Sequence, residues 1–126
     1  MVAIKTPSAP EAIGPYVQGV NLGNMVITSG QLPINPETKA MPEDVAEQAT
    51  QSLKNALAIV KEAGLDANNI VKTTVFVKDL NDFSRVNEAY EAFFNNHDAT
   101  FPARSCVEVA RLPLDAKIEI EVIASR

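Results

Sequence analysis

The C-terminal segment constrains the fold more than any other part of the chain, because its two arms alternate apolar and polar residues. It reads FPARSCVEVARLPLDAKIEIEVIA over residues 101–124. Such alternation is typical of strands with one buried face and one open face. The arms flank a short loop at residues 112–116, so the segment predicts a β-hairpin.

A hairpin pairing fixes which side chains share a face. Matching apolar with apolar residues places Glu108 near Glu119. It also places Cys106 near Glu121, because a one-residue slip would bury the acids. The apolar face is then expected under the helices. Arg104 is expected with Glu119 on the face that points away from them.

The polar face of this hairpin has two interpretations. A solvated surface is ordinary for an antiparallel sheet. Cys106 and Ile123 add apolar character to this face, however, and Phe76 falls on the polar face of the strand over 70–79. The sequence offers no third helix to cover them. A second copy of the chain would cover it, which predicts a homo-oligomer with polar pockets between its sheets.

The whole pattern predicts an α+β fold in the order β-β-α-β-α-β-β, with both helices packed on one face of a mixed β-sheet. The length of 126 residues predicts a single domain over 1–126. The elements expected before the C-terminal segment are two short strands over 16–30 around a turn at 21–24, a loop over 31–44, a helix from Pro42 to Ala63, a strand over 70–79, and a helix over 82–95 with Asn81 as its N-cap.

Composition narrows the function classes. The net charge of -5 opposes binding to a polyanion, so we expect no nucleic-acid partner. One cysteine permits no intrachain disulfide, which favours a reducing compartment. No apolar run is long enough for a signal peptide or a membrane span. We therefore expect a soluble, cytoplasmic protein with no membrane partner.

No motif in the sequence indicates a metal or nucleotide site. His97 is the only histidine and follows the second expected helix in a loop. One histidine and one cysteine make a structural zinc site improbable. Neither a dinucleotide-binding glycine motif nor a phosphate-binding loop occurs.

Four stretches together resemble the reactive intermediate deaminases, the RidA/YjgF family. They are AIGPYVQGV, GNMVITSGQLPINP, VKTTVFVKDLNDFSRVNEAYEAFF and FPARSCVEVARLPLDAKIEIEVIA. The resemblance covers nearly the whole chain. It implies a chorismate-mutase-like fold and a homotrimer with three clefts between subunits.

The resemblance also implies an activity. Members hydrolyse 2-aminoacrylate, its tautomer 2-iminopropanoate, and 2-iminobutanoate to 2-ketoacids and ammonia. These reactive species are released by pyridoxal-phosphate enzymes such as threonine dehydratase, so the family is functionally linked to those dehydratases. No cofactor and no metal are needed.

Two residues would carry the chemistry by this resemblance. Arg104 would bind the substrate carboxylate with its planar, two-pronged donor group. Glu119 would hold and polarise the attacking water and relay a proton to the departing nitrogen. Cys106 would line the pocket, although its residue type alone equally suits a small buried hydrophobe.

Four further residues match family positions. Tyr16 would cap the cleft, while Ser29 and the Gly30 amide would hold substrate or water. The residues alone would instead suggest a strand-end aromatic and a turn. Asn87 matches as a structural contact near the subunit interface.

Two alternatives stay open. The chain could be a trimer that binds and senses 2-ketoacids without turnover; Glu119 disfavours this, because a carboxylate binder gains nothing from a second carboxylate. Ribonuclease and chaperone-like activities are attributed to relatives, but the acidic composition and the absence of a histidine pair disfavour RNA cleavage.

Overall fold

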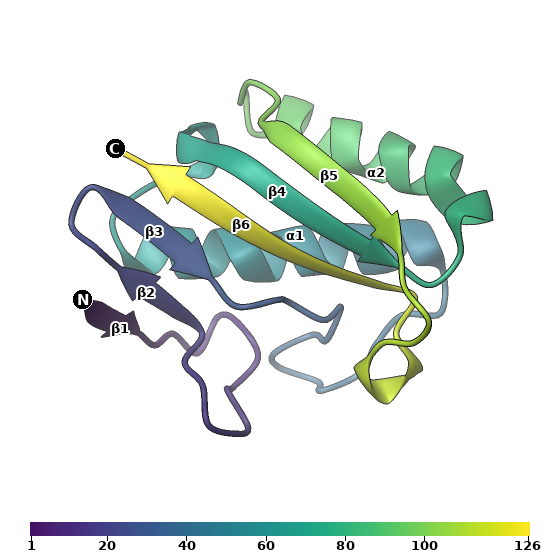
Figure 1. Cartoon of the computed structure of the whole chain (residues 1–126), viewed down its shortest axis with the longest axis horizontal. Coiled ribbons are helices and arrows are strands. Elements are labelled where there is room, and N and C mark those ends of the chain that lie inside the picture. The colour runs from purple at the N-terminus through teal and green to yellow at the C-terminus, as the bar shows by residue number, and fades with distance from the viewer.

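The computed structural model describes residues 1–126 and contains two helices on a six-stranded sheet (Figure 1). The strands around the turn at 21–24 and the strand beginning at residue 70 are confirmed, whereas β1 was not foreseen. The elements are β1 (Val2–Ile4), β2 (Gly19–Asn21), β3 (Met25–Thr28), α1 (Val45–Glu62), β4 (Ile70–Val77), α2 (Phe83–Asn96), β5 (Ala103–Glu108) and β6 (Ile118–Ser125).

The starts of the helices differ from the sequence prediction. Helix α1 begins after Asp44, whose side chain accepts a hydrogen bond from the Glu47 amide, and not at Pro42. The N-cap of α2 is Asp82, not Asn81, and it makes no capping bond with its side chain. Neither helix is long and apolar enough to cross a membrane.

The predicted C-terminal hairpin is wrong. The strand order is β1-β2-β3-β6-β4-β5, so β4 lies between the two arms. Strand β5 pairs in parallel with β4 after the α2 crossover, and β6 pairs antiparallel with both β4 and β3 (Figure 1). The mixed sheet with both helices on one face is confirmed, but the contacts of Glu108 with Glu119 and of Cys106 with Glu121 do not form.

The new pairing reverses the faces of β5. Thr73 is buried toward α2 and pairs with both Arg104 and Val122. Residues paired side by side share a face, so Arg104 points toward the helices. Glu119 pairs with Phe76 on the opposite face. The expectation that Arg104 and Glu119 share a face is therefore wrong.

The reason lies in the position of β5. It is an edge strand, so both of its faces remain partly open and alternation does not reveal which side meets the core. The central strand β6 behaves as predicted, because every second residue is buried beneath the helices. These buried residues are Ile118, Ile120, Val122 and Ala124.

Ser52 is the one buried side chain without a hydrogen-bond partner. It lies within α1 and is fully buried. We expect Ser52→Ala to raise the free energy of unfolding by about 1 kcal/mol, because the orphan hydroxyl disappears and alanine favours helix. Urea unfolding measures the change. Thr50→Ala is a control, since the Thr50 hydroxyl donates to the Ala46 carbonyl; loss of stability in Ser52→Ala would contradict the expectation.

Candidate functional site

Arg104 is held by side chains of α2. Its Nη1 donates to the Asn87 Oδ1 at 2.8 Å, and its guanidinium lies 4.8 Å from the centre of the Tyr90 ring and 5.5 Å from that of Phe83. Tyr90 is fixed in turn by a 2.7 Å hydrogen bond between its hydroxyl and that of Thr73. Every neighbour of the cation is uncharged, and most of its five N–H donors remain free.

Cys106 lies two residues further along the same face of β5. It is half-buried and packs against the hydrophobic core. Burial raises the pKa of the Cys106 thiol, and the nearby Arg104 charge offsets only part of this. A thiol with a raised pKa stays protonated at neutral pH and is a weak nucleophile. The geometry therefore favours pocket lining over covalent chemistry.

Glu119 lies on the other face of the sheet, against the segment that follows β3. The carboxylate packs so closely on Gly30 that a methyl group there would overlap it. Burial raises the pKa of the Glu119 carboxyl above its ordinary value, and the nearby Glu121 carboxylate raises it further. A carboxyl group with a raised pKa is suited to exchange protons near neutral pH.

Gly30→Ala is expected to displace the Glu119 carboxylate, because the added methyl would occupy its place. The fold should survive, since the atom displaced is the end of a flexible side chain. If Glu119 takes part in turnover, its misplacement should slow turnover by about a hundredfold. Steady-state kinetics measure this. A full effect of Gly30→Ala in a Glu119→Gln background would show that it does not act through Glu119.

Ser29 directly precedes Gly30 in the chain. Its hydroxyl donates to the Val17 carbonyl at 2.6 Å, and its amide donates to the Gln18 carbonyl. Beyond it, Gln31 and Ile120 exchange backbone hydrogen bonds, which places Gly30 alongside β6. Ser29, Gly30 and Glu119 therefore form one cluster.

Tyr16 lies on the N-terminal loop next to this cluster and is 51% exposed. The loop is anchored by Gln18, whose buried amide binds the backbone of Thr6, Ala9 and Pro10. Tyr16 lines a cavity of about 800 Å³ between this loop and β1. No other predicted site residue lines that cavity, which excludes Arg104 and Cys106 as well as the Ser29, Gly30 and Glu119 cluster.

The chain thus brings the predicted site residues together in two separate groups. Arg104, Cys106 and Asn87 lie between β5 and α2, while Ser29, Gly30 and Glu119 lie across the sheet. Glu108 and Arg104 do not pair, because the Glu108 carboxylate accepts from the Leu80 amide. Within one chain, Arg104 and Glu119 therefore lie on opposite faces of the sheet.

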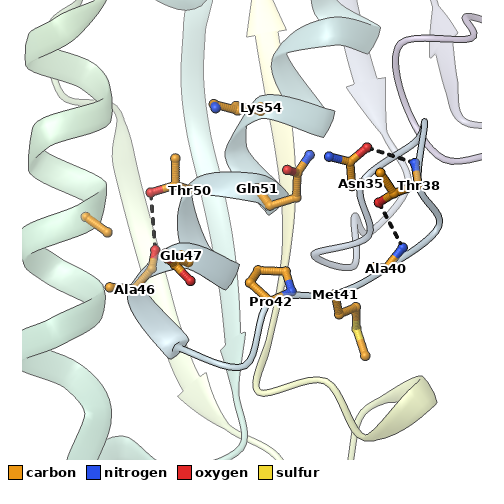
Figure 2. Close-up of a pocket in the computed structure, with 11 residues that line it drawn as sticks. Asn35, Thr38, Ala40, Met41, Pro42, Ala46, Glu47, Thr50, Gln51 and Lys54 are labelled. Atoms are coloured by element: carbon orange, nitrogen blue, oxygen red, sulfur yellow. Dashed lines mark hydrogen bonds between the residues drawn. The ribbon is translucent and has the colours of Figure 1, made fainter.

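Another hollow, of about 590 Å³, lies between the loop at residues 35–42 and the start of α1 (Figure 2). Its side chains include Glu47 and Lys54, but no residue singled out from the sequence lines it. Its polar groups along the loop bind one another, as the hydrogen bonds drawn from Asn35 and Thr38 show. This hollow therefore contributes no residue to the Arg104 group or to the Glu119 group.

The chain is similar to a known protein family over nearly its whole length. The model of the endoribonuclease L-PSP family matches residues 6–126. The chain belongs to that family. This confirms the resemblance to the RidA/YjgF proteins, which the same family includes.

Similar proteins within the L-PSP family have been curated and solved. The 2-iminobutanoate/2-iminopropanoate deaminase of Escherichia coli K12 is 72% identical over 123 residues, which cover 98% of this chain and 96% of that protein. The crystal structure of the YjgF gene product from E. coli matches with a TM-score of 0.99 and 69% identity, over 100% of this chain and 99% of that one. A structure of E. coli TdcF with bound serine matches with a TM-score of 0.98 and 59% identity, over 100% and 99%.

The contact of Arg104 with the Phe83 and Tyr90 rings was not predicted from the sequence. Phe83 and Tyr90 fit the buried face of the second helix, and nothing in that pattern links them to a cation. The available signal was Asn87, a polar residue that follows Phe83 by four positions and precedes Tyr90 by three, so all three lie on one helical face. The anchoring role of Gln18 left no comparable signal in the sequence.

Proposed function

We propose that this chain hydrolyses 2-iminopropanoate and 2-iminobutanoate to the corresponding 2-ketoacids and ammonia. The observation that carries the proposal is the 72% identity, over 98% of the chain, to the E. coli deaminase of that name. The side chains suit the chemistry, since the chain offers a cation free of carboxylates and a carboxyl group with a raised pKa.

Arg104 binds the substrate carboxylate through its unused donors. The fork of the guanidinium matches two carboxylate oxygens, and the Tyr90 and Phe83 rings support the cation from one side of α2. Cys106 lines the same pocket. The serine bound by E. coli TdcF, a small molecule with a carboxylate, is consistent with such a pocket.

Glu119 activates the attacking water. The ionised carboxylate takes a proton as water adds to the imine carbon and returns it to the nitrogen, which gives the carbinolamine. It then carries the hydroxyl proton of the carbinolamine to the same nitrogen as ammonia leaves. The carbon–nitrogen bond breaks and a carbonyl forms, so one water is consumed for each ammonia released. Gly30 leaves room for the carboxylate, and Ser29 supplies polar atoms nearby.

A site that needs Arg104 and Glu119 together requires two subunits. Within one chain they point to opposite faces of the sheet, and the face bearing Glu119 also carries Phe76 and Ile123 with no helix above it. We therefore propose a homotrimer whose clefts take Arg104 from one subunit and Glu119 from its neighbour. Tyr16 caps the cleft from the side of Glu119.

The cellular setting of the reaction is also a proposal. The substrates are unstable imines, so an enzyme that releases them must act nearby; pyridoxal-phosphate dehydratases acting on serine and threonine fit this chemistry. A cytoplasmic location and a single domain over 1–126 stay predictions. Small imino acids and ketoacids are the proposed ligands, with no nucleic-acid partner.

The direct test is the decay of freshly generated 2-iminopropanoate. A threonine dehydratase acting on serine supplies the imine, and semicarbazide traps what survives. We expect the protein to accelerate decay in proportion to its concentration, and the heat-inactivated protein to have no effect. Unchanged decay together with binding of 2-ketobutyrate would instead support a ligand-sensing trimer.

A further inference from the structure

Arg104 differs from the other arginines that meet a side chain. Arg85 and Arg111 each form an ion pair with an aspartate, at 2.8 and 3.1 Å. Arg104 meets only the amide of Asn87 and two aromatic rings, and forms no ion pair. Within its own chain, the positive charge of Arg104 is therefore held in place without being neutralised.

The geometry of α2 explains how this is achieved. Phe83, Asn87 and Tyr90 lie on one helical face because they are spaced by four and three residues. The ring centres of Tyr90 and Phe83 lie 4.8 and 5.5 Å from the guanidinium carbon, and the Asn87 oxygen accepts a hydrogen bond from Nη1 at 2.8 Å. An amide oxygen orients the guanidinium as a carboxylate oxygen would, but it carries no charge to compete with a ligand.

We propose that Asn87 is a positioning residue whose neutral amide keeps Arg104 available, so that the pocket prefers a carboxylate over the matching neutral group. The inference rests on the proposed function only in taking Arg104 as the carboxylate anchor. Asn87 acts through Arg104 and need not touch the ligand.

Asn87→Asp is the decisive substitution, because it keeps the shape of the side chain and replaces the amide with a carboxylate. The introduced carboxylate would pair with Arg104, and an incoming carboxylate would have to compete with it. The measurement is the affinity of the full-length protein for 2-ketobutyrate and for its neutral amide, 2-oxobutanamide, by calorimetry. We expect the wild-type preference for the acid to fall by at least about tenfold in Asn87→Asp.

Asn95→Asp is the matched control. Asn95 lies on the same helix and is exposed, so this variant makes the same change in net charge away from Arg104. Its ligand preference should equal that of the wild type. Asn87→Ser, which stays neutral, should weaken binding of both ligands but retain the preference for the acid.

Three outcomes would overturn the proposal: an unchanged preference in a folded Asn87→Asp, an equal loss in Asn95→Asp, or a wild type that does not prefer the acid. The proposed function fails separately. If the wild type does not hydrolyse the imine but still prefers the acid, and Asn87→Asp removes that preference, then the role of Asn87 stands without the deaminase. Melting curves of each variant verify that it is folded.

Discussion

Arg104→Ala should lower kcat/KM for imine hydrolysis by about thirty- to several-thousand-fold, which corresponds to the loss of one charged, two-pronged contact of about 2–5 kcal/mol. The fold should remain, because Arg104 is half-buried at the edge strand and lies outside the hydrophobic core. The semicarbazide-trapping assay measures the rate, and circular dichroism monitors the fold.

Two further variants show which property of Arg104 causes the loss of activity. Arg104→Lys keeps the charge but not the planar fork, so it should recover only part of the activity. Arg111→Ala removes an exposed arginine that pairs with Asp115 and should leave the rate unchanged. Near-normal turnover in a folded Arg104→Ala would remove Arg104 from the proposed mechanism.

Glu119→Gln should slow turnover by about 10²- to 10⁴-fold while 2-ketobutyrate still binds, because the amide cannot take a proton from water. The contrast with Arg104→Ala is the informative result, since that variant should lose ligand affinity as well. Single-turnover kinetics with separate measurement of binding distinguish the two. Unchanged turnover in Glu119→Gln would move water activation to another group.

The raised pKa of Glu119 gives this prediction a pH signature. Wild-type activity should fall on acidification through a pKa above the ordinary glutamate value of 4.5, as the carboxylate gains a proton. The contribution of Glu119 to folding stability changes with pH in the opposite direction to the activity. A raised folded-state pKa favours the protonated folded protein, so its contribution is present below the unfolded pKa and is lost as pH rises through the folded one. Glu119→Gln should therefore gain stability relative to the wild type as pH rises.

Arg104→Ala and Glu119→Gln together test whether each cleft is shared between two subunits. Each alone should be nearly inactive. Unfolding and refolding a mixture should restore activity, because about a quarter of the clefts would combine an intact Arg104 with an intact Glu119 by random assembly. No recovery in mixed oligomers would place both residues in one subunit, contrary to their opposite faces in the chain.

Local patterns in the sequence were enough to predict most elements of this fold. The alternation in β6 correctly identified its buried residues, and the helix predicted from Pro42 to Ala63 contains α1. These features depend on residues close in the chain. Which strands pair with each other depends instead on residues far apart in the chain, and this is where the prediction failed.

The wrong hairpin has a physical explanation. Alternation shows that a segment is a strand, but it does not show which strand lies beside it. The stretch between β5 and β6 spans residues 109–117, longer than the two- to five-residue loops of most hairpins. Together with the strand–helix–strand order of β4, α2 and β5, that length favoured a parallel crossover.

The site was predictable only in part for the same reason. Family resemblance pointed to Arg104 and Glu119 individually, and their roles stay predictions. The shared face that the hairpin gave them was a coincidence of a wrong pairing. The neutral surroundings of Arg104 depend on α2 packing behind β5, which is a tertiary contact. Such contacts between residues far apart in the chain can hardly be recognised from local sequence patterns.

The central position of β6 has a consequence for biosynthesis. Strands β3 and β4 do not pair with each other; each pairs with β6, the last of the six to be made (Figure 1). A nascent chain that lacks residues 118–125 holds two incomplete sheet fragments, each with an exposed edge open to non-native pairing. The sheet becomes continuous only when β6 is inserted, so protection from aggregation comes only after the other five strands have been made.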